Sequence, residues 1–356
     1  MANFTLYSPS EQVASHLRAE IIAGRWSGTM PGAPTLAVEL AVDSKTVWAA
    51  LNLLENEGLL ISEGTGRRRR ISLPPETTPS ALRVAILDYD PLEQTENWSI
   101  SMQQQLAEQG HSSFFAEKSL TELEMDLGRI IRLVGQTRAD AWIICSGSRE
   151  ILTWFSQQTT PAFALFGRRR ELSIAGVGPD HNSAGRAAVR RLLELGHRRI
   201  VILVRDSQRA GGPGQAERII LEEMVAQGLP IGTYNLPGWK NNPEDFHRVL
   251  KELFRVTPPT ALIIDEPFLF HAAKDHLAQR GILAPKHVSL ICTDPDPTFA
   301  WSIPTIAHIK WLTPPIVRRV VRWTNNIARG KNDRRQSFTK AEFIEGGTVG
   351  KPTGER

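Results

Sequence analysis

The sequence is poor in cysteine: Cys145 and Cys292 are the only two among its 356 residues. Each of them ends a short apolar run, WIIC in the first case and SLIC in the second. A disulfide-stabilised fold is therefore not expected. We predict two buried free thiols rather than a disulfide or a metal-binding pair.

Long apolar stretches are also missing. The apolar runs, such as residues 260–264, are far shorter than the roughly 20 residues of a membrane-spanning helix. Residues 1–10 lack the basic start and the apolar core of a secretory signal. We therefore expect no membrane partner and, by default, a cytoplasmic location.

No constellation of catalytic or metal-ligating residues stands out. The sequence shows no Ser/His/Asp or Cys/His arrangement, and His181 and His197 have no metal-like spacing to Cys, Asp or Glu. The glycine-rich stretch 210–214 precedes a predicted helix and could hold an anion, but it lacks the Gly-Lys-Ser/Thr of a nucleotide P-loop. An ordinary loop is the simpler interpretation. We expect no cofactor, no metal and no enzymatic activity.

What remains is the composition of a folded chain with two or three domains. Hydrophobic residues make up 41% and charged residues 22%, which is typical of a packed globular protein. The formal net charge of +4 permits nucleic acid as a partner without requiring it. Changes of pattern divide the chain into an N-terminal domain at 1–72, a proline- and threonine-rich linker at 73–81, a large domain at 82–350 and a tail at 351–356.

Residues 1–72 have the pattern of a winged helix-turn-helix. Apolar residues recur at helical spacing in residues 10–24, in a second short helix around 36–40, and in a third helix that Asp43 or Ser44 can cap and Gly58 ends. A strand at 59–62, a turn with two glycines and a returning strand at 67–72 follow. In such a domain the third helix enters the major groove and the wing lies along phosphates.

The segments QVASHLRAEIIAGRW and LAVELAVDSKTVWAALNLLENEGLL resemble the DNA-binding domain of GntR-family transcription regulators. The match covers about 65 residues, with a first helix ending in AG-x-W, a recognition helix, an LE-x-EGL stretch and a G-x-G wing. It implies a winged helix that reads DNA. Gly32, Ala33 and Pro34 stand where the family has Ser-Glu-Arg, and Ser44 and Trp48 stand where it has arginines in the recognition helix.

Charge within this segment is concentrated in the wing. Residues 1–74 contain seven Lys and Arg and seven Asp and Glu, and four of those seven cations are consecutive arginines. Attraction to phosphate must therefore be local. A solvated face is the alternative interpretation of the arginine run, and core packing is the alternative for Trp48. We predict that the following residues contact DNA: Ser44, Lys45, Thr46, Trp48, Thr65, Arg67, Arg68, Arg69 and Arg70.

From residue 82 onwards, short apolar strands alternate with helices. Strands are expected at 83–88, 140–145, 162–166, 174–177, 200–204, 261–265 and 288–292, and helices at 96–110, 121–136, 150–157, 183–195, 215–227, 244–254, 268–280 and 315–328. This alternation predicts an α/β fold with parallel sheets covered on both faces. About 260 residues suit two doubly wound lobes, with a ligand in the cleft at the carboxyl ends of the strands.

The segment VGPDHNSAGRAAVRRLLELGHRRIVIL resembles the corresponding motif of LacI/GalR-type effector domains. Asp265–Glu266, Gly281–Pro285, Leu290–Asp296 and Pro304–Ile306 resemble later landmarks of that family, and residues 341–349 resemble its closing strand. The resemblance spans roughly residues 82–350. It implies a periplasmic-binding-protein-like fold used as an intracellular sensor of a sugar or another small metabolite.

Candidate ligand-binding residues follow the predicted strands. Asp90 follows the first strand, and Asp265 and Asp294 close two later ones. Arg218 lies ten residues before Gly228, as the family's cleft arginine lies before the glycine that ends its helix. Carboxylates and an arginine can bind a hydroxyl-rich ligand, on which Trp98 or Trp301 could stack. Helix caps and turns are the alternative role of the aspartates. Glu266 and Leu221, which replace the family's Asp and Gly, leave the usual ligand in doubt.

These features predict a DNA-binding transcription regulator, most simply a homodimer that reads a two-fold operator in double-stranded DNA. A small-molecule effector, a sugar or a derivative, would bind between the lobes and change the affinity for DNA. Repression and activation are both open. The alternative is a small-molecule-binding protein whose DNA-binding module has lost its function, which the missing family arginines motivate.

Overall fold

The computed structural model describes residues 8–22, 24–26, 28–64, 67–72, 81–205 and 212–353. The chain forms two compact units, one of residues 1–82 and 322–333, the other of residues 83–321 and 334–356. The predicted linker at 73–81 lies almost entirely outside the described residues. No described helix is both long enough and apolar enough to cross a membrane.

The described residues of the first unit form the helices α1 (Pro9–Ile22), α2 (Ala33–Leu40) and α3 (Ser44–Asn56) and a hairpin of β1 (Leu60–Ile61) and β2 (Arg70–Ile71), together with the last residues of α11 (Thr313–Ala328). Its core consists of apolar residues that recur at helical spacing, such as Leu17 and Ile21 in α1 and Val47, Leu51 and Leu54 in α3. All five are essentially inaccessible to solvent. Three helices followed by a hairpin are the elements, in the order, that the sequence predicts for residues 1–72.

Local signals set the limits of α3 as predicted. The Asp43 carboxylate accepts a hydrogen bond from the Lys45 amide (2.9 Å) and caps the first turn. Gly58 follows the helix with φ of 77°, a left-handed conformation that glycine adopts without strain. In the hairpin, Leu60 pairs with Ile71 and Ile61 pairs with Arg70 in antiparallel register.

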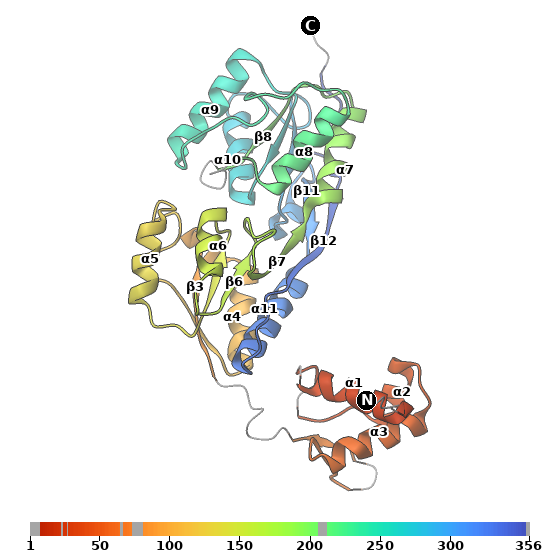
Figure 1. The fold of residues 1–356 in the computed structure, drawn as a ribbon. Helices are drawn as coiled ribbons and strands as arrows, with labels where there is room; N and C mark the ends of the chain where they lie inside the picture. Colours follow the sequence, from red (N-terminus) through yellow and green to blue (C-terminus); the bar gives the residue numbers. More distant parts are fainter. Residues whose placement is uncertain are drawn as a thin grey trace, which may run out of the picture. The chain divides into compact units, whose positions relative to one another are not determined.

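The second unit is built on a ten-stranded sheet with the order β4-β3-β5-β6-β7-β12-β11-β10-β9-β8 (Figure 1). All neighbouring strands in it are parallel except β11 and β12. The strands are β3 (Arg83–Leu87), β4 (Ser112–Phe115), β5 (Ala141–Cys145), β6 (Ala162–Leu165), β7 (Ala175–Asp180), β8 (Ile200–Leu203), β9 (Ala261–Ile264), β10 (Ser289–Cys292), β11 (Ala307–Trp311) and β12 (Gln336–Ile344).

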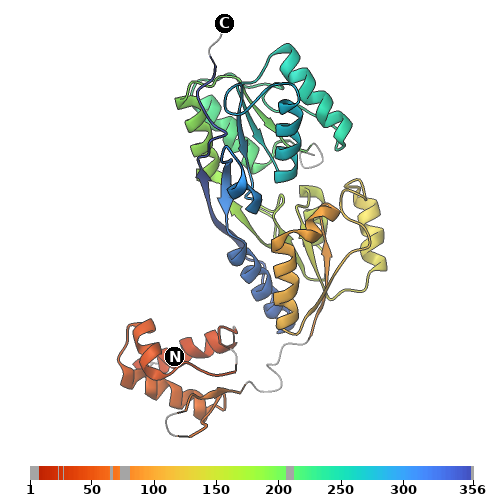
Figure 2. The same ribbon diagram turned by 180° about the vertical axis from the view of Figure 1, so that it is seen from behind.

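The sheet carries helices on both faces because successive side chains of its buried strands point to opposite faces (Figures 1 and 2). In β9, Leu262 and Ile264 pack with α9 and α10, whereas Ala261 and Ile263 pack with α7 and α8. The helices are α4 (Asn97–Glu108), α5 (Leu127–Gln136), α6 (Arg149–Ser156), α7 (His181–Glu194), α8 (Gln215–Ala226), α9 (Pro243–Val256), α10 (Pro267–Ala278) and α11 (Thr313–Ala328).

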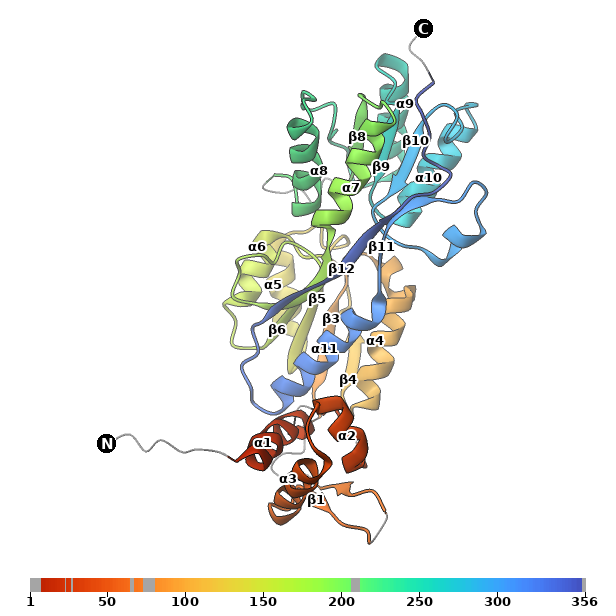
Figure 3. The ribbon, with the colours of Figure 1, turned by 90° about the vertical axis from the view of Figure 1, so that its right-hand side faces the viewer.

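Three segments join the two lobes of this unit. We call the part with strands β3 to β7 lobe 1 and the part with strands β8 to β11 lobe 2. β7 of lobe 1 leads into α7 of lobe 2, and β11 of lobe 2 leads into α11. β12 pairs with β7 through residues 336–340 and with β11 through residues 341–344, so it belongs to both lobes (Figure 3). The sheet is therefore continuous through β12.

The α/β fold with two lobes is as predicted, while several boundaries are not. β4 and β11 were not expected, and the closing strand covers 336–344 rather than 341–349. The helix expected at 121–136 begins only at Leu127, because Asp126 caps it through the Arg129 amide (2.7 Å). Cys145 and Cys292 are buried and free, as predicted.

Candidate functional site

A cleft of about 1670 Å³ lies between the two lobes of the second unit. Residues that follow the carboxyl ends of six parallel strands line it, which is where ligands bind in doubly wound folds. They are Asp90 after β3, Ser146 after β5, Phe166 after β6, Arg205 after β8, Asp265 after β9 and Asp294 after β10. The three predicted aspartates thus line one cavity.

Arg205 joins the lobes at one end of the cleft. Its Nη1 donates to Asp90 Oδ2 of lobe 1 (3.2 Å), and its Nη2 lies 3.0 Å from Glu266 Oε2 of lobe 2. The guanidinium also lies over the ring of Tyr89 from lobe 1 and the ring of Phe268 from lobe 2, at 5.1 and 4.7 Å. Each lobe therefore supplies one carboxylate and one aromatic ring. We call this group the Arg205 clamp.

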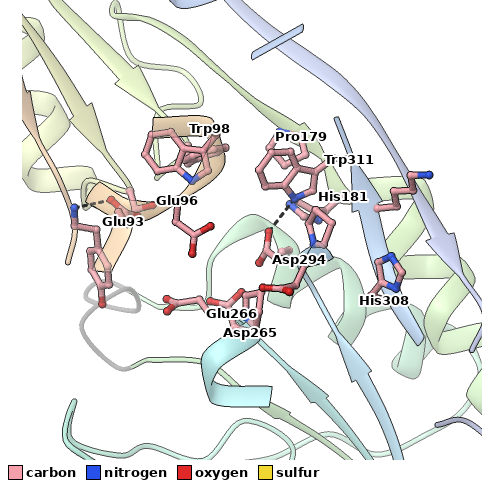
Figure 4. A pocket seen from close by; sticks show the side chains of 18 of the residues that line it. Glu93, Glu96, Trp98, Pro179, His181, Asp265, Glu266, Asp294, His308 and Trp311 are labelled. Carbon is pink, nitrogen blue, oxygen red and sulfur yellow. Dashed lines mark hydrogen bonds between the residues drawn. The ribbon is translucent and has the colours of Figure 1, made fainter. Parts of the chain in front are cut away.

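Beside the clamp, several carboxylates face the same space. Figure 4 shows Glu96, Asp265, Glu266 and Asp294 around the centre of the cleft, with Glu93 at its edge. Burial raises the pKa of Glu93 to about 8. Burial and the neighbouring Asp294 carboxylate raise the pKa of Asp265 to about 7. Burial also raises the pKa of Glu96 and of Glu266, because enclosed carboxylates lose hydration.

Hydrogen bonds orient the predicted aspartates. Thr293 Oγ1 donates to Asp265 Oδ1 (2.6 Å), and it also lies 3.1 Å from Asp294 Oδ2. The indole Nε1 of Trp311 donates to Asp294 Oδ1 (2.9 Å; Figure 4). Asp90 additionally caps the 3₁₀ helix η2 (Pro91–Thr95) through the Leu92 amide. The sequence left open whether Asp90 caps a helix or lines the cleft, and the structure shows that it does both.

Aromatic rings form one wall of the cleft. Trp98 contacts Phe166 edge to face (centroids 5.5 Å apart), and Phe166 contacts Trp311 (5.6 Å). Trp98 thus lies where a stacking residue was expected. Trp301, the other tryptophan considered for this role, does not line the cleft and is 88% exposed. The second tryptophan of the cleft is Trp311, which lies on β11, a strand that we did not predict.

Arg218 lines the cleft from α8, yet it is exposed and bonded to Gln215 of its own helix (Nη2 to Oε1, 3.0 Å). The arginine that joins the two lobes is instead the buried Arg205, which we did not predict from the sequence. Its signal was present: a charged residue directly follows the apolar strand IVILV at the edge where ligands bind.

A second buried arginine supports the wall of the cleft. Arg169 fits over Gly176 and Gly178 of β7: a Cβ at Gly176 would lie 2.5 Å from Arg169 Cδ, and one at Gly178 would lie 3.0 Å from its Nη1. Its Nη1 donates to the Phe166 carbonyl and its Nη2 to the Ser337 carbonyl, both at 3.2 Å, which ties this loop to β12. Burial and the neighbouring Arg170 lower its pKa to about 10.

In the first unit, α3 and the hairpin present the residues predicted to contact DNA. Ser44, Lys45 and Trp48 are exposed on α3, and Thr46 is half-buried. The 57% exposure of Trp48 excludes the alternative that it is a core residue. Thr65 lies outside the described residues.

The four wing arginines, all of which we predicted to contact DNA, differ in their exposure. Arg67, Arg68 and Arg70 are exposed, with Arg70 3.4 Å from Glu63. Arg69 instead lies against α3 with an 18% exposed side chain, paired with Glu55 (2.9 Å). Exposure alternates along residues 68–71: Arg69 and Ile71 are partly buried, whereas Arg68 and Arg70 are exposed.

Comparison with known proteins supports the fold of the second unit. Residues 189–349 match the family model of a periplasmic binding protein-like domain. No curated protein matches the chain at the level of sequence.

Several solved structures of transcription regulators are similar to the chain. The Escherichia coli transcriptional repressor ascG is 17% identical, with a TM-score of 0.55 over 76% of this chain and 100% of that chain. A LacI family transcriptional regulator from Enterococcus faecium with bound ribose is 16% identical, with a TM-score of 0.58 over 76% and 99%. The transcriptional regulator CelR–cellobiose complex is 15% identical, with a TM-score of 0.61 over 90% and 100%. At these identities the likeness concerns the fold.

Proposed function

We propose that the chain is a DNA-binding transcription regulator whose affinity for an operator is controlled by a small molecule bound between the two lobes. The observation that carries this proposal is the combination, in one chain, of an exposed helix-and-wing surface and a two-lobed cleft. Neither part has a constellation for catalysis among the residues discussed above. A binding switch needs only these two sites and a conformational change that both of them bias.

On the DNA side, the GntR-type motif in the sequence and the exposure of α3 support reading of the major groove. Lys45 and Trp48 offer a hydrogen-bond donor and an apolar ring to base edges. Arg67 and Arg68 provide exposed charge for phosphates. The wing, rather than the helix, would then supply most of the electrostatic affinity.

On the effector side, carboxylates and aromatic rings favour a sugar or a sugar derivative. Carboxylates such as Asp265 and Asp294 accept hydrogen bonds from hydroxyl groups, and Trp98 and Trp311 offer ring faces or edges to a pyranose. Two structurally similar regulators are complexes with sugars, one with ribose and one with cellobiose. These similarities motivate sugars as the first ligands to test by thermal shift, because a specific ligand raises stability by mass action.

We propose that the regulator is a homodimer, and one apolar surface supports a second copy as the partner. Trp301 and Ile303 are 88% and 100% exposed, around the end of the 3₁₀ helix η4 (Pro297–Trp301). Two large, neighbouring apolar side chains in water are unfavourable unless a partner covers them. A two-fold dimer would present two winged helices to a two-fold operator.

The test is fluorescence polarisation with genomic DNA fragments, including those around the chain's own gene. The parent should prefer one fragment over a scrambled sequence by a factor of about 10³ or more at physiological salt. Log affinity falls linearly with log salt, and we call the steepness of this fall the salt slope. The double variant Arg67→Gln/Arg68→Gln should lower the salt slope by about 1.8, because two phosphate contacts are lost.

Arg132→Gln is the matched control, since Arg132 is an exposed arginine of α5 in the second unit. It should leave the salt slope unchanged. Equal affinity of the parent for every fragment at every salt concentration would contradict the proposal.

A second candidate function remains, a small-molecule-binding protein without operator recognition. The specific observation in its favour is that the exposed face of α3 carries Ser44 and Trp48 where the GntR pattern has arginines. A ligand-induced rise in melting temperature without any operator preference would favour this alternative.

A further inference from the structure

Arg69 is set apart from the other wing arginines by its contacts with α3. Its Nε donates to Glu55 Oε2 (2.9 Å), and its Nη2 donates to Asn52 Oδ1 (2.6 Å). A guanidinium held through two of its nitrogens has a fixed plane, because both bonds lie in that plane. Arg69 is therefore an ordered side chain rather than a mobile surface cation.

The third contact of Arg69 is with Trp48. The guanidinium carbon lies 5.8 Å from the centre of the indole ring. Residues 48, 52 and 55 recur at intervals of four and three, so they form one stripe along α3. This stripe is distinct from the buried one of Val47, Leu51 and Leu54. Arg69 thus contacts Asn52, Glu55 and the aromatic residue of α3, Trp48.

Backbone hydrogen bonds hold the main chain at Arg69 in place. The Arg69 carbonyl accepts a hydrogen bond from the Met30 amide (2.8 Å), and the next residue, Arg70, pairs with Ile61 across the hairpin. Arg69 therefore directly precedes β2, and backbone hydrogen bonds hold it and its neighbour in place. Its direction towards α3 is fixed by its side-chain bonds to Glu55 and Asn52.

We propose that Arg69 is a positioning residue that holds the Trp48 ring in the orientation in which it meets base edges. Arg69 would then contribute to sequence discrimination and not to the attraction for phosphate. This inference rests on the proposed function as a DNA-binding regulator. It assigns different roles to adjacent arginines, Arg68 for phosphate and Arg69 for the reading surface.

Two physical arguments support this division. An indole that is 57% exposed has several accessible rotamers, and a fixed cation over its face favours one of them. Glu55 already neutralises the charge of Arg69, whereas Arg68 is exposed. Neutralising phosphates releases counterions from DNA, and a cation that is paired within the protein releases few of them.

The ring itself suggests which base is read. An apolar surface in the major groove distinguishes thymine by its C5-methyl group, the one apolar feature among the base edges there. We therefore expect the selected site to contain a thymine whose methyl group contacts Trp48. Replacing that thymine by uracil removes the methyl group and leaves every hydrogen-bonding group of the base in place.

The experiment uses the full-length chain and DNA selected by the parent protein from a random duplex library. Affinities for the selected site and for a scrambled site are measured over a salt series. Arg69→Gln should lower the ratio of the two affinities about tenfold, the size of one lost base contact. It should leave the salt slope unchanged. The matched variant Arg68→Gln should lower the slope by about 0.9 and keep the ratio.

Three further measurements separate positioning from a general loss of structure. Uracil in place of the critical thymine should weaken binding by the parent and not by Arg69→Gln. Arg69→Lys keeps the charge but not the two-nitrogen geometry, so it should not restore the ratio. Glu55→Gln should free the charge of Arg69, which raises the slope by about 0.9 while the ratio falls.

The inference is overturned if Arg69→Gln changes the slope as Arg68→Gln does and keeps the ratio, since Arg69 is then a phosphate contact. It is also overturned if Glu55→Gln changes neither quantity. A parent protein that selects no sequence at all would instead contradict the proposed function.

Discussion

The Arg205 clamp gives the sharpest prediction for the second unit. We expect Arg205→Met to destabilise this unit by about 3 kcal/mol, the lower end of the cost of breaking a buried ion pair. The side chain is 4% exposed and has carboxylate oxygens at 3.2 and 3.0 Å. Methionine keeps most of the volume but leaves Asp90 and Glu266 without their shared cation. For a unit of this size the melting temperature should fall by about 6–12 °C.

Asp90→Asn should cost less, about 1 kcal/mol, because Asp90 is 21% exposed and asparagine can still cap the Leu92 amide. The assay is urea unfolding of both single variants and the double variant. Direct contact predicts a coupling energy above about 0.5 kcal/mol. Arg218→Met is the control: Arg218 is exposed on the same cleft and bonds only within its own helix among the contacts described, so the change should stay within about 0.5 kcal/mol.

Two results would refute this reasoning. Strict additivity of the changes at Asp90 and Arg205 would mean that the two residues do not stabilise each other. A loss for Arg205→Met no larger than that for Arg218→Met would mean that burial of the clamp contributes nothing. In either case the lobes would not be joined at this point.

Three other predictions concern pH, capping and assembly. Burial raises the pKa of Glu93 from 4.5 to about 8, so between these pH values the folded chain holds a proton that the unfolded chain has released. The free energy of unfolding should therefore fall as the pH rises through that window. Glu93→Gln should make the midpoint of urea unfolding less dependent on pH there. Asp43→Ala should cost the first unit about 1 kcal/mol in thermal unfolding, since the cap of α3 is lost, and an unchanged melting curve would contradict this role. The double variant Trp301→Ser/Ile303→Ser should sediment as a monomer where the parent sediments as a dimer. Val256→Ser, which changes another exposed apolar residue, should leave the dimer intact. A parent that is already monomeric would exclude this interface.

Periodicity and capping residues in the sequence were sufficient to predict most elements of the fold. Strands such as IVILV and ALII are apolar at every position because both of their faces are buried, so they are easy to recognise. β11 was missed because its pattern, AHIKW, mixes apolar and polar residues. That mixture reflects its position: Lys310 is exposed, and Trp311 faces the cleft.

The candidate site was only partly predictable, because its chemistry arises from contacts between distant segments. A residue directly after a strand is expected at the cleft, which is why Asp90, Asp265 and Asp294 were found. The pairing of Arg205 with Asp90 joins residues 115 positions apart, and no local pattern encodes it. Arg69 shows the same limit on a smaller scale, since a run of four arginines does not indicate which one faces inward.

The charges of the cleft indicate how ligand and clamp would act together in a regulator of the proposed kind. Glu93 and Glu96 belong to lobe 1, whereas Asp265 and Asp294 belong to lobe 2, so a ligand that bonds to both sets stabilises the closed arrangement. Arg205 stabilises the same arrangement without a ligand. A ligand can shift this equilibrium only by its differential affinity for the two states. The clamp therefore sets how much of the closed state exists before the ligand binds. Weakening it should lower the apparent affinity for the ligand and increase the change in DNA binding that the ligand causes.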